Sequence, residues 1–413
     1  MAANTPAPDS QSAARYDVVI VGGGPVGLAL ALALRGNAGR GRRVLLLDAG
    51  QGWASDVRIL ALSYGSRLIL DKLGVWPFLQ AVTPIAAIHV SQRGRFGRTR
   101  LAAEEMRLPA LGYVVDYASL QTAMREALGK PARRGVSTAP SHTAAQDFSH
   151  LTGACVTECR FGKDCAAVEF EAGASGQKTR VTASLVVFAD GGATGNASIA
   201  TFRDYHQSAV VAQVTSERPH HSVAYERFAT EGPIALLPFG SRMALVWTTT
   251  PTRAAELIEL DERRFLDALG AHFGDRLGSF TAATHRASYP LRLRHVSPTA
   301  ASRQVLIGNA AQTLHPVAGQ GFNLGLRDAW ALAQELNGDA AADAGSEKLL
   351  HAYRAKRDLD RRGGIFFTDA LVRVFSNDSA LLGLARGAGL AALDCLPAAK
   401  RFLIRRMVFG ASG

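Results

Sequence analysis

Apolar residues near the start of the chain follow the order strand, helix, strand. Residues 16–21 (YDVVIV) form a continuous β-rich run that is typical of a buried parallel strand, and residues 28–34 continue as an Ala- and Leu-rich helix. A second apolar run at residues 44–47 ends at Asp48. Strands that alternate with helices in this way predict an α/β fold with a parallel sheet.

Glycines fill the turn between the first predicted strand and the helix, with the spacing G-x-G-x-x-G. The cofactor-binding candidates in this motif are Gly22, Gly24, Pro25, Val26 and Gly27. In such a turn the first glycine permits the bend, the second lets the backbone approach a pyrophosphate, and the third lets helix and strand pack closely. Asp48 stands where an acid accepts hydrogen bonds from ribose hydroxyls, so the unit predicts a dinucleotide site. A glycine-rich turn without a ligand is the alternative.

A second strand–loop–helix pattern, with more glycine and polar candidates than the first, occupies residues 305–336. An apolar strand at 305–307 ends at Gly308 and Asn309, and a helix is predicted over 323–336. The loop residues that become candidates are His315, Pro316, Gly319, Gln320, Gly321, Phe322 and Asn323. Two glycine-rich turns, far apart in the chain and each before a helix, suit a long extended cofactor. The N-terminus of the second helix would stabilise the negative charge of a reduced flavin, which favours FAD.

The segment HPVAGQGFNLGLRD, at residues 315–328, closely resembles the signature of the ubiquinone-biosynthesis hydroxylases, a family of FAD-dependent aromatic hydroxylases. The order of the motifs is also similar, and the resemblance extends over about residues 16–375. It implies an α/β fold in which a Rossmann-like FAD-binding domain of the glutathione-reductase type is interleaved with a mixed-sheet substrate domain. A C-terminal helical tail is expected to follow.

This resemblance implies boundaries for each part of the chain. Residues 1–15 are small and polar, and we expect them to form a disordered leader. The FAD-binding domain is expected at residues 16–80, 110–200 and 296–340, the substrate domain at 81–109 and 201–295, and a helical region at 341–413.

Some positions gain a role only through the resemblance. Arg58 is expected to reach the flavin nucleotide, and Gln121 lies in a segment that contacts FAD in the family. Asp190 and Gly191, which end an apolar run, correspond to a second fingerprint near FAD and the nicotinamide. A plain turn at a strand end is the alternative for this pair. The Ser and Arg that usually follow are absent, which leaves nicotinamide contacts there open.

Two more departures lie in the second motif. Asn309 replaces the common Asp that hydrogen-bonds the ribityl chain, a bond that an amide can still make, and Gln312 replaces the common His. The sequence GNAAQTLHP looks like the subgroup that acts on 2-polyprenyl-6-methoxyphenol.

The implied activity is that of a monooxygenase. NAD(P)H would reduce FAD, O2 would add to give a C(4a)-hydroperoxide, and an electron-rich phenol ring would attack the distal oxygen. The sequence has one G-x-G-x-x-G, so NAD(P)H is expected to dock transiently as a co-substrate. Because FAD supplies the chemistry, no acid/base triad is expected. We interpret His315 and Pro316 as shaping the loop over the ring rather than as a base and its neighbour.

The substrate side is predicted from strands at residues 209–214, 234–238 and 243–248. A polyprenyl tail needs an apolar groove, and the candidates for its wall are Leu236, Pro238, Phe239 and Trp247. Each of these side chains also suits an ordinary core position.

The composition narrows the possible partners. The net charge is +11, but the arginines are scattered and no aromatic-plus-basic cluster of a nucleic-acid module is present. None of the four cysteines forms a C-x-x-C pair, so we expect free thiols in the cytoplasm and no metal site.

Residues 379–413 form a basic amphipathic pattern, which suits either the anionic inner face of a membrane or packing on the domain or a partner. Contact with a ubiquinone-biosynthesis complex and homo-oligomerisation both stay open.

Two other functions fit the same motifs. The chain could hydroxylate another small aromatic compound, which the quinone content of a deletion strain would reveal. It could also be a noncatalytic assembly subunit that retains FAD, and the absence of reductant-driven flavin turnover would then be expected.

Overall fold

The computed structural model describes residues 14–35, 42–50, 57–130, 147–173, 176–193, 200–314, 319–339, 341–375 and 380–410. The described strands are β1 (Arg15–Val21), β2 (Val44–Asp48), β3 (Ile59–Ser63), β4 (Thr83–Ile85), β5 (Ala87–Gln92), β6 (Arg98–Ala102), β7 (Gly112–Asp116), β8 (Phe148–Thr152), β9 (Ala154–Phe161), β10 (Ala166–Ala172), β11 (Gln177–Phe188), β12 (Ala200–Ser216), β13 (Val223–Phe228), β14 (Ile234–Phe239), β15 (Arg242–Thr249), β16 (Phe280–Val296), β17 (Ala300–Ala301), β18 (Gln304–Leu306) and β19 (Gln312–Thr313). The described α-helices are α1 (Pro25–Arg35), α2 (Tyr64–Lys72), α3 (Tyr117–Gly129), α4 (Pro251–Glu259), α5 (Glu262–Phe273), α6 (Gln320–Gly338), α7 (Glu347–Phe375), α8 (Ala380–Cys395) and α9 (Pro397–Phe409). Short 3-10 turns are η2 (Trp76–Phe78), η3 (Ala103–Met106), η5 (Asp275–Leu277) and η6 (Gly308–Ala310).

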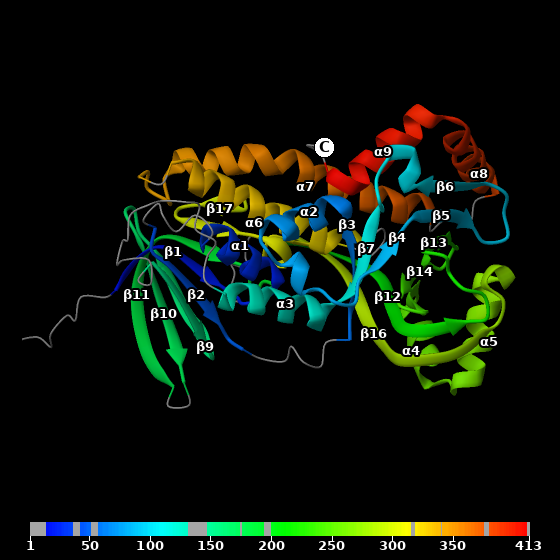
Figure 1. Cartoon of the computed structure of the whole chain (residues 1–413), viewed down its shortest axis with the longest axis horizontal. Coiled ribbons are helices and arrows are strands. Elements are labelled where there is room, and N and C mark those ends of the chain that lie inside the picture. The colour runs from blue at the N-terminus through cyan, green and yellow to red at the C-terminus, as the bar shows by residue number, and fades with distance from the viewer. Residues whose placement is uncertain are drawn as a thin grey trace, which may run out of the picture.

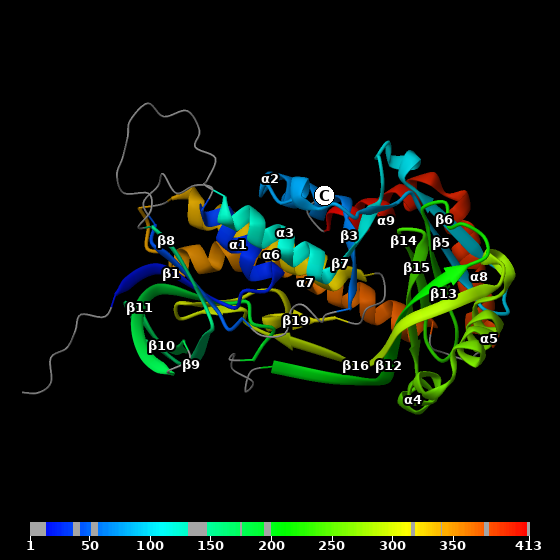
Figure 2. The same ribbon diagram turned by 60° about the horizontal axis from the view of Figure 1, so that its bottom comes forward.

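The first sheet has a parallel part in the order β18-β11-β1-β2-β8, and β10 pairs antiparallel with β11 while β9 pairs antiparallel with β10. Helices α1, α3 and α6 lie over one face of this sheet (Figure 2). Strands β1, β2 and β18 lie where the sequence analysis predicted apolar strands. The predicted α/β fold of the glutathione-reductase type is therefore confirmed.

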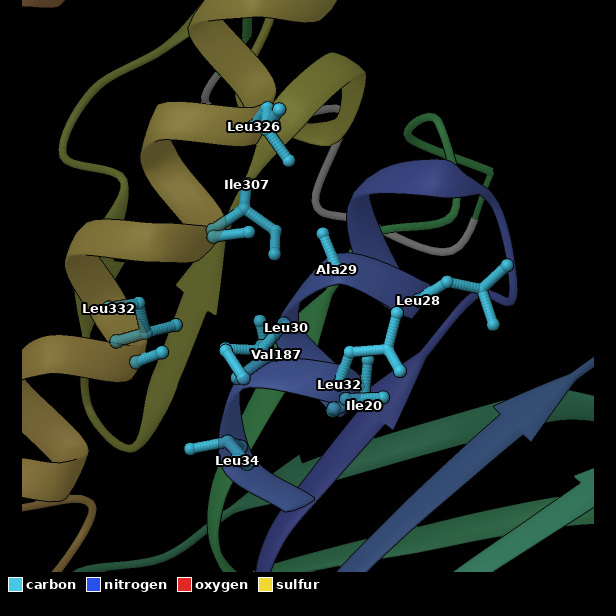
Figure 3. Close-up of a cluster of buried hydrophobic side chains, with 14 of the residues drawn as sticks. Ile20, Leu28, Ala29, Leu30, Leu32, Leu34, Val187, Ile307, Leu326 and Leu332 are labelled. Carbon is cyan, nitrogen blue, oxygen red and sulfur yellow. The ribbon is translucent and has the colours of Figure 1, made fainter. Parts of the chain in front are cut away.

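Both faces of the first sheet are covered, which explains its continuous apolar runs. Val18 and Ile20 point toward the helices, where they join the cluster that includes α1 and α6. Figure 3 shows this cluster, with Leu30 of α1 and Leu332 of α6 among its side chains. Val19, which points the other way, packs against β9 and β10.

The second sheet has the order β19-β16-β12-β15-β14-β13-β5-β6 (Figure 1 and Figure 2). Strands β5 and β6 come from an early part of the chain, whereas β12 to β16 come after β11 of the first sheet, so distant segments build one sheet. Helices α4 and α5 cover one face through a core that includes Phe265 and Leu269. Residues of the other face, among them Leu237 and Val246, line a cavity together with residues of the C-terminal helices.

The C-terminal helices pack on the chain itself. Helix α8 lies against β6, where Asp394 accepts hydrogen bonds from the hydroxyl of Thr99 and the N–H of Arg100, both at 3.1 Å. Helix α9 buries Ile404 and Val408 against residues of β6, η3 and the loop before β7. Part of the amphipathic pattern in the tail is thus used for packing on the chain itself. No helix in the described ranges has the length and apolar character needed to cross a membrane.

A buried ionic network joins the second motif to α6 and α7. The carboxylate of Asp328 accepts hydrogen bonds from Gly308 N at 3.3 Å, Gln312 Nε2 at 2.8 Å and Arg357 Nε at 2.8 Å. Arg357 also lies 2.8 Å from the carboxylate of Asp360. Because all of these side chains are buried, removing one partner leaves a charge without compensation.

We therefore expect Arg357→Met to lower the free energy of unfolding by about 3–5 kcal/mol. Lys356→Met is the matched control on the same helix, because Lys356 is half exposed and its pair with Glu335 at 2.7 Å should contribute less than about 1 kcal/mol. Denaturant unfolding of both variants measures the difference. Equal losses in the two variants would show that the network does not stabilise the fold.

Candidate active site

The turn between β1 and α1 consists of glycines, so backbone atoms rather than side chains lie at the N-terminus of α1. Gly22 has a φ of +112°, and a Cβ there would lie 2.7 Å from the backbone of Ala189. A Cβ on Gly27 would collide with the carbonyl oxygen of Gly22, so helix and strand pack closely. At Gly24 a Cβ would face open space, with the Tyr117 hydroxyl at 3.9 Å as the nearest atom. This space fits a pyrophosphate, which the first N–H groups of α1 would bind.

Asp48 ends β2 with a fully buried carboxylate. Arg125 Nη2 lies 2.7 Å from its Oδ2, the N–H of Gly50 donates to its Oδ1 at 3.0 Å, and His150 Nε2 lies 3.7 Å from Oδ2. Burial alone would raise the pKa of Asp48, but His150, the Gly50 N–H and the Arg125 charge outweigh it and hold the pKa below its usual value. The carboxylate is therefore ionised and suited to accept hydrogen bonds from ribose hydroxyls.

Gln121 supports the glycine turn from α3. Its Nε2 donates to the carbonyl oxygen of Gly23 at 3.2 Å, and its Oε1 is buried without a hydrogen-bond partner in the described part of the chain. Buried amide oxygens normally accept a hydrogen bond, so this atom suits a donor on a ligand.

The two glycine motifs pack directly on each other. A Cβ on Gly308 would lie 3.1 Å from the side chain of Val26, and a Cβ on Gly325 would lie 2.9 Å from the Cα of Gly308. The start of α1 and the start of α6 therefore approach one another because these positions lack side chains. Asn309 follows Gly308 at this junction.

Asn323 fixes the beginning of α6, which follows Gly319 in a left-handed conformation with a φ of +58°. Its Oδ1 accepts hydrogen bonds from Ser63 N at 2.8 Å and the Ser66 hydroxyl at 2.7 Å. Its Nδ2 donates to the carbonyl oxygens of Ala61 and Gly319, both at 2.9 Å. Asn323 is thus a structural support of the loop rather than part of an open surface.

One cavity of about 880 Å³ is lined by both motifs and by the inner face of the second sheet. The sequence-predicted residues on its wall are Gly22, Gly24, Pro25, Val26, Asp48, Arg58, Asp190, Gly191, Asn309, Gly319, Gly321 and Phe322. Arg58 stacks on the ring of Tyr117, with its guanidinium carbon 4.6 Å from the ring centroid.

Other predicted residues lie beside the cavity rather than on its wall. Gly27, Gln121 and Asn323 support the surrounding turns, as described above. Gln320 reaches the carbonyl oxygen of Met407 at 3.5 Å. His315 and Pro316 lie outside the described residues.

The predicted groove wall needs a correction. Leu236 and Trp247 are buried in the core beneath α4 and α5, on the opposite face of the sheet. Their strand neighbours Ala235, Leu237 and Val246 line the cavity instead. Side chains alternate between the faces of a strand, and the run IALLPF is apolar on both faces, so the pattern does not distinguish them.

Two other groove candidates also lie off the cavity wall. Pro238 is buried on the same side of β14 as Leu236. Phe239 packs on the small cluster of Ile85, Val114 and Ala224.

Three residues near the cavity were not predicted. Arg125 and His150 contact Asp48 from α3 and β8, and Glu226 of β13 lies on the cavity wall. The first two belong to no local motif, so only the fold brings them to Asp48. Glu226 alternates with apolar residues in the run VAYERF, which is the one signal that marks it as a polar side chain on an apolar face.

Comparisons with known proteins agree with this architecture. The family model described as an FAD binding domain matches residues 15–361. Ubiquinone hydroxylase UbiL of Rhodospirillum rubrum is 35% identical over 404 residues, which cover 94% of this chain and 88% of that protein. The 3-demethoxyubiquinol 3-hydroxylase of Escherichia coli is 31% identical and is matched over 93% of this chain and 96% of its own length.

Solved structures show the same fold at lower identity. The p-nitrophenol 4-monooxygenase PnpA of Pseudomonas putida superposes with a TM-score of 0.74 at 18% identity, covering 96% of this chain and 99% of that one. PqsL of Pseudomonas aeruginosa, a probable FAD-dependent monooxygenase, superposes with a TM-score of 0.69 at 19% identity over 91% of this chain and 99% of its own. The family predicted from the second motif is confirmed: this chain belongs to the ubiquinone-biosynthesis hydroxylases, a family of FAD-dependent monooxygenases.

Proposed function

We propose that this protein hydroxylates the aromatic ring of a polyprenylated phenol, 2-polyprenyl-6-methoxyphenol, with NAD(P)H and O2 as co-substrates. The observation that carries the proposal is the continuity of the cavity. Its glycine-lined part, with Asp48 and Arg58, is polar, whereas the part between the second sheet and the C-terminal helices is apolar. A dinucleotide and a lipid-like phenol need these two environments side by side.

The residues present fit FAD in the polar part. The N-terminus of α1 offers N–H groups to a pyrophosphate, Asp48 offers acceptors to the ribose, and Gln121 Oε1 lacks a partner within the described residues. The N-terminus of α6 would face the flavin ring and favour its reduced, negatively charged form. When bound, FAD supplies the redox chemistry that activates O2 for transfer of one oxygen atom to an aromatic ring.

The apolar part suits a ring with an isoprenoid tail. Its walls come from three regions of the chain: β5 and β6, strands β13 to β15, and the C-terminal helices. The apolar wall residues are Ile85, Ile88, Val90, Leu101, Phe228, Leu237, Val246, Phe367, Leu390, Leu393, Leu403 and Met407. Burial of a prenyl tail against such walls stabilises the complex by roughly 0.8 kcal/mol per CH2 group. The same walls exclude water from the reacting ring.

The relatives support the metabolic setting. The E. coli relative is named for hydroxylation of a demethoxyubiquinol, and the mouse relative, 29% identical over 92% of this chain and 88% of its own length, is named a ubiquinone biosynthesis monooxygenase. The first name states the hydroxylation of a ubiquinol precursor, and the second states a monooxygenase of ubiquinone biosynthesis. From these two names we infer a prenylated ring as the class of substrate here.

The direct test is oxygen transfer by the purified protein. With FAD, NAD(P)H and 2-methoxy-6-prenylphenol under 18O2, we expect a catechol or hydroquinone product that carries one 18O atom, measured by mass spectrometry. 4-Hydroxybenzoate, a small anionic phenol without a tail, should be turned over far less. Absence of any labelled product, with FAD bound and NAD(P)H present, would contradict the proposal.

A second prediction concerns the ribose contact. Asp48→Asn should weaken FAD binding about tenfold or more, because a hydrogen bond to a charged group contributes about 1.5–3 kcal/mol. Flavin fluorescence during titration of the apoprotein measures the dissociation constant. Asp17→Asn is the control, since Asp17 lies on β1 and accepts a hydrogen bond from Arg43 N on the exposed surface. Unchanged affinity in Asp48→Asn would exclude the assigned contact.

A further inference from the structure

We propose that the second sheet carries a binding site for a phosphate group on its α5 face, which is the face that α4 and α5 cover. The site is formed by Arg93, which follows β5, by Arg227 of β13 and by Arg276 of η5. It lies on the opposite side of the sheet from the cavity, so it is separate from the function proposed above. In both views, β5, β13 and α5 lie at the other end of the molecule from β1 and β11 (Figure 1 and Figure 2).

The alternation of side chains along β13 places Arg227 on the α5 face. Phe228 lines the cavity, whereas the ring of Tyr225 meets the ring of Phe273 in α5 edge to face, with centroids 5.7 Å apart. Arg227 lies two residues after Tyr225 and therefore on the same side of the strand. A Cβ on Gly274, the residue after α5, would lie 3.4 Å from Arg227 Nη1. The guanidinium of Arg227 is thus next to the C-terminal end of α5.

Arg93 reaches the same end of α5. Its Nη1 lies 3.1 Å from His272 Nδ1, and its Nη2 donates to the carbonyl oxygen of Ala271 at 3.4 Å. Burial, followed by the charges of neighbouring arginines, lowers the pKa of His272 to about 4, so the ring is neutral at neutral pH. A guanidinium can only donate, so Nδ1 accepts and the ring proton is on Nε2. His272 is 5% exposed, and its Nε2 is a buried donor without an acceptor within the described residues.

His89 of β5 lies on the other side of Tyr225. The two residues are paired in the sheet, and their rings lie 5.9 Å apart. The Nε2 of His89 is also buried without a hydrogen-bond partner in the part of the chain that the structure describes. Burial, followed by the charges of Arg276 and Arg98, lowers the pKa of His89 to about 4. Arginines from separate parts of the chain thus act on one small region of the α5 face.

These arginines lack a carboxylate partner. Across the described ranges, Arg93, Arg227 and Arg276 have no carboxylate oxygen within 4.0 Å of their guanidinium nitrogens. Arg227 is half-buried, and its Nε is buried without a hydrogen-bond partner in those ranges. Burial, followed by the charges of Arg276 and Arg93, lowers the pKa of Arg227, and the opposing effect of Asp275 is smaller. Like charges therefore repel one another at the end of α5.

The chemistry of this region suits an anion. The guanidiniums of the three arginines and the Nε2 of His272 are all N–H donors. An anion with several oxygens accepts from such donors and offsets the repulsion, whereas unpaired charges in a partly buried place cost free energy. A phosphate group carries about 1.5 to 2 negative charges at neutral pH and three acceptor oxygens, which is more than a carboxylate offers. Several converging arginines therefore match a phosphate group better than a carboxylate.

The test uses the holoenzyme, in which FAD occupies the pyrophosphate site of the first glycine motif. Calorimetric titration with inorganic phosphate should show saturable binding at one site per chain. We expect Arg227→Gln and Arg276→Gln each to weaken this binding about tenfold or more, since each loses a hydrogen bond between charged groups. Arg264→Gln is the matched control and should bind like the wild type, because Arg264 lies on the exposed surface of α5 and pairs with Asp261 at 3.4 Å.

Thermal unfolding gives a second readout and shows whether the variants are folded. Phosphate should raise the Tm of the wild type and of Arg264→Gln, but not that of Arg227→Gln. Without phosphate, Arg227→Gln should unfold at the wild-type temperature or above it, because the substitution removes repulsion and breaks no ion pair. If phosphate raises the Tm of all these proteins equally, binding occurs elsewhere and the proposed site is overturned.

Vesicles distinguish the two sources of a phosphate group, a lipid headgroup and a soluble compound. Sedimentation of the wild type with vesicles of phosphatidylcholine and phosphatidic acid, but not with pure phosphatidylcholine, supports a headgroup if Arg227→Gln abolishes it. Binding of inorganic phosphate that depends on Arg227, without sedimentation, supports a soluble phosphate compound. If the wild type binds neither inorganic phosphate nor the vesicles, or if Arg227→Gln binds both as the wild type does, the proposal is wrong.

Discussion

The buried carboxylate of Asp328 is the constraint on which the arrangement of the second motif depends. It holds the N–H of Gly308, the amide of Gln312 and the guanidinium of Arg357, which belong to η6, β19 and α7. Because η6 also packs on Val26 of α1, fixing Gly308 fixes the distance between the two glycine turns. A cofactor that spans both turns needs this distance to be constant. An ionic network achieves this where an apolar contact would allow sliding, since each of its hydrogen bonds has a direction.

The local parts of the site could be predicted from the sequence. The glycine motif, the strand before it, the helix after it and the acidic residue all lie in one continuous segment of the sequence. Gly22, Gly24 and Asp48 could therefore be predicted as candidates before the structure was known. Contacts between distant segments were not predictable, and Arg125, which comes to Asp48 from a helix later in the chain, is an example. The faces of β14 were also not predictable, because that strand is apolar on both sides: Leu236 lies in the core, and Leu237 lines the cavity.

The replacement at position 312 has a clear physical role in the structure. Gln312 donates from Nε2 to Asp328 at 2.8 Å and accepts at Oε1 from Arg361 Nε at 2.6 Å. An amide offers a donor and an acceptor at the same end of the side chain, so it links a carboxylate to a guanidinium without carrying charge itself. This departure from the family pattern is therefore built into the same network that holds the second motif.

The cavity is closed by helices that lie late in the chain. Leu390 and Leu393 come from α8, and Leu403 and Met407 from α9, whereas the nucleotide end is built mostly from the first 60 residues and from the second motif. During synthesis on the ribosome, the nucleotide end therefore exists before the wall of the apolar end has been made. The inner face of the second sheet stays open until α8 and α9 emerge and pack against it. The apolar chamber is completed only after nearly the whole polypeptide has left the ribosome.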